Sequence, residues 1–276
     1  MGRVAKADVL AFWRDGVVCL RGLLPRDLVR EMQDPVERAL TSAQSADLTA
    51  MAVVFGSGGP GRGRFVAGID HWRHQPEFRA FACDSPLPEA VATLLRSDTA
   101  FLYEDSVLVK EPGTLEVTRW HQDLGYFHID GTQMCTTWCP LDPVTTASGA
   151  MQFVRGSHRD GPVYRPNLFV TDEPIPGTEG ETVPDIDAGD HDIISFELDP
   201  GDVTVHHART LHAAGANQSR ATRRRAISVR YCGDDARVHV RPGAPRKPHQ
   251  HGLETGDRLG GDAHPQVWPR RAAPNP

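Results

Sequence analysis

The sequence predicts a mainly β fold, either a sandwich or a closed barrel, with helices on its N-terminal side. The main observation is a series of short β-prone segments between residues 100 and 232, separated by turns rich in Gly and Pro. A second observation is that helical patterns are confined to the part before residue 100. The length of 276 residues suits one such domain, and the 39% hydrophobic share is enough for a core.

The N-terminal part contains three segments with helical character. They are residues 6–14, 25–40 and 86–95, and a short strand is expected at 16–20. Residues 56–63 are rich in glycine but lack the Gly-Lys-Ser/Thr ending of a phosphate-binding loop. We therefore expect a lid or turn there.

The β-prone part follows from residue 100. The expected strands are residues 101–102, 106–110, 118–127, 134–141, 150–154, 191–198, 202–207 and 224–231. The connection 165–192 is long and acidic, as in loops that form lids or are disordered. We predict a single domain over residues 1–241, with its core strands at about 100–232. A polar extension rich in Pro and Gly follows at 242–276.

Charge and composition exclude several partners. The net charge is −6, and Arg223–Arg225 is the longest basic run, so we expect no nucleic-acid partner. No apolar stretch approaches the roughly 20 residues of a membrane span, and the N-terminus lacks the apolar run of a signal peptide. The five cysteines are scattered without a Cys-x-x-Cys pair, as expected for reduced thiols. These features predict a cytoplasmic protein without membrane contact, and they indicate no particular oligomeric state.

His121 and Asp123 stand out because they are two residues apart in a predicted strand, where alternate side chains share a face. An imidazole and a carboxylate on one face provide two ligands of a 2-His-1-carboxylate iron site. His212, 91 positions later, is a candidate for the third. The pattern alone is weak, because His128/Asp130 and His158/Asp160 form equivalent triplets.

The flanking residues resemble the phytanoyl-CoA dioxygenase (PhyH) family of Fe(II)/2-oxoglutarate oxygenases. The resemblance runs from Phe12 to Tyr231 in family-like order and spacing. Its strongest pieces are Trp120-His121-Gln122-Asp123-Leu124-Gly125-Tyr126-Phe127, Thr137-Trp138 with Asp142, Ser148-Gly149-Ala150-Met151-Gln152-Phe153-Val154 with Gly156-Ser157-His158, Pro200-Gly201-Asp202-Val203, His212 with Gly215, Asn217 and Ser219, and Arg224 with Ala226-Ile227-Ser228. The resemblance implies a double-stranded β-helix, a jelly-roll and cupin relative with flanking α-helices.

The resemblance also implies the metal ligands. His121 and Asp123 match the first two, and His212 has the family context of the third. His128 and Asp130 match nothing, and we interpret them as strand-end polar residues. His158 matches a structural turn. His206 or His207 should line the pocket, since alternation turns one of the pair inward.

Three residues are expected to contact 2-oxoglutarate. Arg224 matches the family arginine that pairs with the far carboxylate, with Arg225 as the neighbouring alternative. Trp138 matches a residue that packs at the cosubstrate, and Gln133 is a candidate for a nearby polar contact. Ala214 stands where the family often has a serine.

The implied activity is that of an Fe(II)/2-oxoglutarate-dependent dioxygenase. It would use O₂ to hydroxylate an unactivated C–H bond of a small or medium organic molecule, with release of succinate and CO₂. Asp123 favours hydroxylation over halogenation, because related halogenases have a small residue at this position. Desaturation, epimerisation and cyclisation stay open. The alternatives from other classes are a non-catalytic cupin-like binding protein and a zinc hydrolase that uses the same three ligands.

Overall fold

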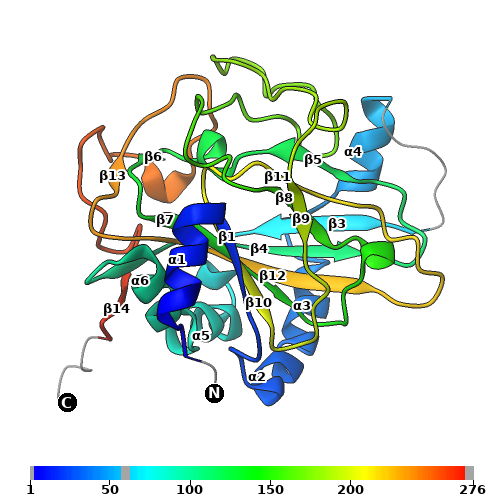
Figure 1. Cartoon of the computed structure of the whole chain (residues 1–276), viewed down its shortest axis with the longest axis horizontal. Helices are drawn as coiled ribbons and strands as arrows, with labels where there is room; N and C mark the ends of the chain where they lie inside the picture. Colours follow the sequence, from blue (N-terminus) through cyan, green and yellow to red (C-terminus); the bar gives the residue numbers. More distant parts are fainter. Residues whose placement is uncertain (1–2, 57–62, 271–276) are drawn as a thin grey trace.

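Two β-sheets lie opposite each other in the computed structural model, which describes residues 3–56 and 63–270 (Figure 1). The larger sheet has the strand order β1-β10-β7-β12-β4-β3-β2, with β14 paired to β4. Its strands are β1 (Val17–Leu20), β10 (Val203–His207), β7 (Met134–Pro140), β12 (Arg224–Cys232), β4 (Ala100–Lys110), β3 (Phe65–Ile69), β2 (Ser45–Asp47) and β14 (Gln266–Trp268).

The smaller sheet contains β5 (Thr118–His121), β11 (His212–Ala214), β8 (Met151–Val154) and β9 (Ile193–Ser195), in that order. A separate two-stranded ladder joins β13 (Arg237–Val238) to β6 (Ile129–Asp130). All strand pairs in these sheets are antiparallel. The prediction of a mainly β fold is confirmed, and the architecture is a double-stranded β-helix.

The helices cover the outer face of the larger sheet (Figure 1). They are α1 (Lys6–Asp15), α2 (Arg26–Glu31), α3 (Gln33–Ala39), α5 (Pro76–Asp84) and α6 (Leu87–Leu95), whereas α4 (Leu48–Val54) lies near β3. Period-two alternation divides the strands between two environments. On β12, Ile227, Val229 and Tyr231 join the core beneath the helices. Arg224 and Ser228 on the same strand face the space between the sheets.

The helix expected at 25–40 is two helices, which is a correction. The first ends at Glu31 and the second begins at Gln33. Pro35 explains the break, because proline has no backbone N–H to donate and its ring crowds the carbonyl four residues earlier. Four further α-helices and strands before the β-rich part were not predicted, namely β2, α4, β3 and α5.

Residues 242–270, the described part of the predicted C-terminal extension, pack on the rest of the chain. Strand β14 adds to the edge of β4. Lys247 forms an ion pair with Asp70 at 2.8 Å and a second ion pair with Glu104. Residues 57–62 of the expected glycine-rich lid lie outside the described residues. Among the described residues, no helix is long and apolar enough to cross a membrane.

We expect Ile227→Ala to destabilise the fold by about 2–5 kcal/mol, because Ile227 is fully buried and its truncation leaves a cavity. Ile69 is the matched control, since 44% of its surface is exposed. Ile69→Ala should change the unfolding free energy by less than about 1 kcal/mol. Urea denaturation of both variants would check this, and equal losses would contradict the packing described here.

Two buried histidines that lie outside the cavity between the sheets, His71 and His264, should make the stability of the folded protein sensitive to acid. Burial lowers the pKa of His71 to about 4 and that of His264 to about 3. In the unfolded chain both groups take up protons near pH 6.5, whereas in the folded protein they stay neutral. Stability should therefore be full above pH 6.5 and fall as the pH drops from there to about 4. His264→Gln should flatten this dependence in denaturant titrations at several pH values, and an unchanged slope would argue against it.

Candidate metal centre and cosubstrate pocket

A small cavity of about 30 Å³ lies between the two sheets. Alternate side chains from four strands of the larger sheet form one wall, and the smaller sheet forms the other. The lining residues are Leu108, Thr118, His121, Asp123, Thr136, Trp138, Met151, Phe169, His206, His212, Ala213, Ala214, Arg224, Ser228 and Arg230. The cavity therefore collects most of the residues that the sequence singled out.

His121, Asp123 and His212 converge in this cavity, each less than 5% exposed. The Nε2 atoms of His121 and His212 lie 3.9 and 3.8 Å from Oδ1 of Asp123. Of the residues that the structure describes, this is the one group of His, Cys, Asp or Glu side chains arranged to hold a metal ion. His121 ends β5 and His212 begins β11, and the two residues pair directly across the ladder.

Asp123 lies just beyond the end of the strand that was predicted to carry it. The expected strand 118–127 ends at His121, and Asp123 begins a short 3₁₀ turn, Asp123–Tyr126. The ladder stops at His121 because its partner strand β11 begins at His212. Gln122 between them keeps an extended backbone, so the His121 and Asp123 side chains still project to the same side, as the predicted alternation requires.

Each metal-site imidazole is oriented by a backbone carbonyl. The Nδ1–H of His121 donates to the carbonyl of Arg119 at 2.7 Å, and that of His212 donates to Thr210 at 2.9 Å. Burial lowers the pKa of His121 to about 3 and that of His212 to about 4. Both rings are therefore neutral near pH 7, with Nε2 free to coordinate a metal.

The second oxygen of Asp123 is held by two further side chains. Its Oδ2 accepts hydrogen bonds from the Thr136 hydroxyl and from Nε2 of His206, the latter at 3.2 Å. This arrangement leaves Oδ1 toward the imidazoles. His207 points away and donates to the carbonyl of Thr132 at 2.8 Å. The expectation that one of the two adjacent histidines faces inward is confirmed.

The histidines of the other two His-x-Asp triplets bond to backbone groups and not to the metal cavity. The His128 ring contacts the backbone of Pro245 and Arg241, and the His158 ring contacts the carbonyl of Trp13. Neither histidine lines the metal cavity.

Arg224 is the inward-facing arginine of the triplet 223–225. It is 1% exposed, and its Nε and Nη2 atoms have no hydrogen-bond partner. Its guanidinium lies 5.5 Å from the ring centre of Trp138. Burial lowers its pKa to about 10, so it stays charged at neutral pH. Arg225 points outward and pairs with Asp142 at 2.7 Å and with Glu37 at 3.0 Å.

Gln133 is not part of this pocket, which corrects the expectation of a polar contact. Its side-chain amide donates to the carbonyls of Leu95 and Arg96, and its carbonyl accepts from the N–H of Asp235. The cavity is also lined by Thr136, Ser228 and Arg230, which were not predicted as site residues. A signal for the last two was present, since both follow Arg224 at even spacing on one strand.

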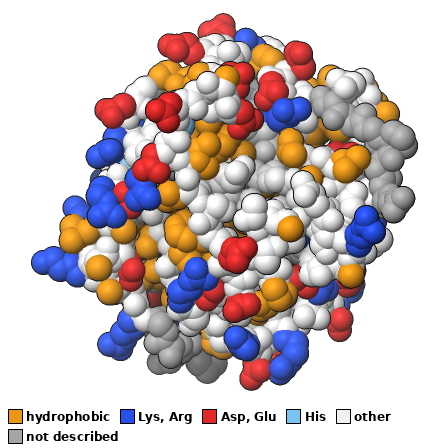
Figure 2. Space-filling view, turned by 45° about the vertical axis from the view of Figure 1, so that its right-hand side comes forward, with side chains coloured by type: hydrophobic (Ala, Val, Ile, Leu, Met, Phe, Trp, Pro, Cys, Tyr) orange, Lys and Arg blue, Asp and Glu red, His pale blue; other side chains and the backbone are white. Residues whose placement is uncertain are grey.

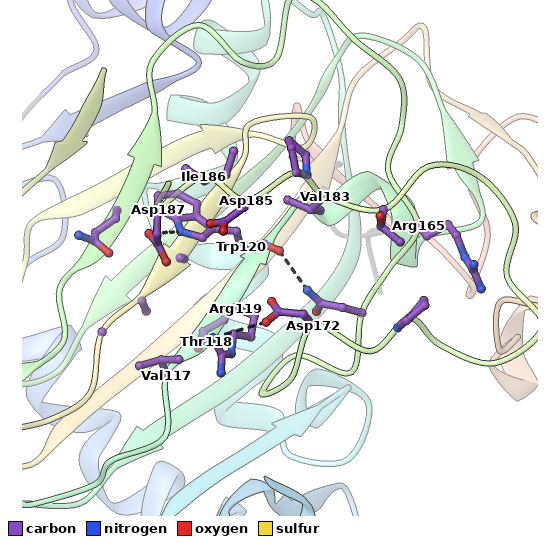
Figure 3. A pocket seen from close by; sticks show the side chains of 18 residues that line it. Val117, Thr118, Arg119, Trp120, Arg165, Asp172, Val183, Asp185, Ile186 and Asp187 are labelled. Carbon is purple, nitrogen blue, oxygen red and sulfur yellow. Dashed lines mark hydrogen bonds and ion pairs between the residues drawn. The ribbon is translucent and has the colours of Figure 1, made fainter. Parts of the chain in front are cut away.

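A larger cleft of about 630 Å³ lies beside the cavity (Figure 3). Thr118, Ala213 and Ala214 line both spaces. The loop between β8 and β9 forms much of its wall, including Val183, Asp185, Ile186 and Asp187. Figure 2 shows acidic side chains gathered over the top of the molecule, where Figure 1 places this loop.

Two neutral imidazoles and one carboxylate in a buried cavity are the donor set of non-haem iron enzymes with open coordination positions. The unpaired Arg224 guanidinium in the same cavity suits a ligand carboxylate. The class defined by this fold and site is thus an iron- and 2-oxoglutarate-dependent oxygenase.

The chain belongs to the phytanoyl-CoA dioxygenase (PhyH) family, whose model matches residues 12–226. Iron and 2-oxoglutarate are accordingly its metal and cosubstrate.

Individual relatives differ in what they act on. One from Stutzerimonas stutzeri, named "Probable alpha-ketoglutarate-dependent hypophosphite dioxygenase", is 30% identical over 163 residues. That match covers 54% of this chain and 51% of the relative, so the chain spans about half of its length. The 1-deoxypentalenic acid 11-beta-hydroxylase of Streptomyces exfoliatus is 28% identical, with 74% of this chain and 72% of the relative covered.

The fold of this chain is similar to that of solved structures over nearly its whole length. The epimerase SnoN in complex with Fe³⁺, alpha ketoglutarate and nogalamycin RO has a TM-score of 0.72 at 25% identity. The superposition covers 95% of this chain and 98% of that one.

We expect His212→Ala to weaken Fe(II) binding by about 100-fold or more, because it removes a ligand. His207→Gln is the matched control, since His207 is also a buried histidine but lies on β10 of the larger sheet and faces away from the cavity. Anaerobic titration with Fe(II) would measure both affinities. Equal effects of the two substitutions would refute the assignment of His212.

Proposed function

We propose that the protein hydroxylates an unactivated C–H bond of a small or medium organic molecule and converts 2-oxoglutarate and O₂ to succinate and CO₂. The observation that carries the proposal is the convergence of His121, Asp123 and His212 with the unpaired guanidinium of Arg224 in one buried cavity. The bound iron would supply the activation of O₂. The chain would supply the metal ligands, the arginine that anchors the cosubstrate and the side chains that enclose the cavity.

Arg224 would anchor the far carboxylate of 2-oxoglutarate. A buried, permanently charged and planar donor suits a carboxylate better than a lysine does. Trp138 lies against the guanidinium and limits how far it can turn. Ala214 offers no hydroxyl to the cosubstrate, which leaves the carboxylate more dependent on Arg224.

The three side chains would hold the metal together. His121 and His212 present Nε2 from the paired strands β5 and β11, and Asp123 presents Oδ1 from the turn that follows β5. Leu108, Met151 and Phe169 line the same cavity and keep bulk water from it. The presence of Asp123, where a halide would need space, supports hydroxylation over halogenation.

The substrate would lie in the larger cleft beside the cavity. Its volume of about 630 Å³ suits a drug-sized molecule. Its wall combines apolar residues with three carboxylates, Asp172, Asp185 and Asp187, and two guanidinium groups, Arg119 and Arg165. The small excess of negative charge disfavours a polyanion such as a CoA ester. The relative named 1-deoxypentalenic acid 11-beta-hydroxylase and the epimerase SnoN, whose structure contains nogalamycin RO, support a natural-product-like substrate. The five cysteines are free thiols, which supports a reducing, cytoplasmic setting.

We expect Arg224→Gln to weaken 2-oxoglutarate binding by about 100-fold, close to 3 kcal/mol, because it removes a buried charge from the carboxylate site. Arg224→Lys should fall between this variant and the native protein, since lysine keeps the charge but not the planar fork. Arg225→Gln is the neighbouring control and should stay within about threefold. The dissociation constant would be measured anaerobically with Fe(II) present, and a stronger effect at 225 than at 224 would exclude Arg224 as the anchor.

The function itself is tested by two measurements. Anaerobic addition of Fe(II) and 2-oxoglutarate should produce a visible metal-to-ligand charge-transfer band. A non-catalytic binding protein could show this band but would release no succinate when O₂ and candidate substrates are added. A zinc hydrolase would be active with Zn²⁺ alone and indifferent to Arg224→Gln. A succinate-release screen with mass spectrometry of the products would identify both substrate and outcome, and absence of the band would refute the proposal.

A further inference from the structure

Phe169 lies at the boundary between the metal cavity and the outside. It belongs to the loop between β8 and β9, and its ring lines the metal cavity. Its ring centre lies 5.2 Å from that of His121 in an edge-to-face arrangement, and 6.3 Å from that of Phe65 on β3. One half-buried aromatic side chain thus contacts both sheets beside a metal ligand.

The backbone of Phe169 has an unusual conformation. Its φ angle is +68°, a left-handed region that aromatic residues rarely adopt. Its N–H donates to Oδ1 of Asn167 at 2.9 Å, and its carbonyl accepts from the N–H of Arg119 at 2.9 Å. Strained residues of this kind persist where the surroundings hold them, and they cluster at functional sites.

Asn167 fixes this loop to the metal-binding strand. Its Nδ2 donates to the carbonyl of Trp120 at 3.0 Å, and its Oδ1 accepts from the hydroxyl of Tyr126 at 2.8 Å. The position of the Phe169 ring is therefore coupled to β5 and to the turn that carries Asp123.

The cavity beneath Phe169 is small for its expected occupants. A volume of about 30 Å³ holds on the order of two water molecules. A five-carbon keto acid needs more room, so some lining side chain has to move. Leu108, Trp138 and Arg224 belong to hydrogen-bonded strands of the larger sheet. Phe169 belongs to a loop and is half-buried, so rotation of its side chain can widen the cavity while the hydrogen bonds of the loop backbone stay in place.

Phe169 also lies near the place where the cavity meets the outer cleft. Asn167, two residues earlier, lines that cleft. Thr118, Ala213 and Ala214 line both spaces, and two of these side chains are a single methyl group. A β-bulge between the His212 and Ala214 pairs aligns Thr118 with Ala214, on the side of the metal ligands.

We propose that Phe169 is a specificity-determining residue whose ring controls entry to the metal cavity and sets which molecules approach the iron from the cleft. This inference rests on the proposed function, because it assigns the same cavity to 2-oxoglutarate. It adds a residue that determines which molecules enter the cavity and that does not itself bind the metal.

Two substitutions remove the ring in different backbone contexts. Phe169→Gly removes it and suits the left-handed conformation, whereas Phe169→Ala removes it and keeps a Cβ atom in that conformation. Phe101→Ala is the control, because Phe101 is another half-buried aromatic residue that does not line the cavity. The probes are Fe(II) and 2-oxoglutarate themselves. The readouts are the rate at which the charge-transfer band forms on anaerobic mixing, and succinate release without added substrate.

Both Phe169 variants should accelerate band formation by about tenfold and raise substrate-independent succinate release several-fold, since an open mouth admits cosubstrate and solvent more freely. The affinity for 2-oxoglutarate should change less than about threefold, because Arg224 is untouched. Phe101→Ala should behave as the native protein does.

Native rates in both Phe169 variants would overturn the proposal. So would an effect of Phe169→Ala that Phe169→Gly does not share, because the cause would then be the loop backbone instead of the ring. Absence of the band in the native protein would instead refute the proposed function, so the two failures are distinguishable.

Discussion

The antiparallel pairing of β11 with β5 is the contact on which the site depends. It sets His212 directly opposite His121, although 91 positions separate them in the chain. Backbone hydrogen bonds fix both strands, and backbone carbonyls fix both imidazole rings. The two Nε2 atoms therefore point into one space before any metal binds. Folding, and not metal binding, carries the entropic cost of bringing the ligands together.

The same space contains charges that have no complete set of partners within the protein. The Nε and Nη2 atoms of Arg224 are buried without an acceptor, and such groups destabilise a fold unless a ligand satisfies them. Asp123 is satisfied in part, because Thr136 and His206 hold one of its oxygens. A metal cation and a dicarboxylate complement this arrangement. The unpaired Arg224 guanidinium lowers the stability of the free protein, and a bound carboxylate would remove this cost and so bind more tightly.

Segments other than the strands around the site complete the enclosure of the metal cavity and the outer cleft. The loop between β8 and β9 contributes Phe169 to the cavity and most of one wall to the outer cleft. Residues 242–270 contact the rest of the chain through the edge strand β14 and through Lys247. Because Glu104, a partner of Lys247, also lies 3.6 Å from Arg230 of the cavity wall, the C-terminal segment is connected to the site through charged contacts.

The sequence by itself determined the β-rich class, the His121–Asp123 and His212 motifs and the candidate arginines, because residue type, spacing and alternation are local properties. Only the tertiary structure decided how these residues meet. It placed Asp123 on a 3₁₀ turn where a strand was expected, turned Arg224 inward and Arg225 outward, and placed Gln133 away from the pocket. It also selected His206 over His207 as the inward-facing histidine and added Phe169 to the cavity. The physical reason is that ladder ends, bulges and loop paths depend on pairing between distant segments, which no local pattern encodes.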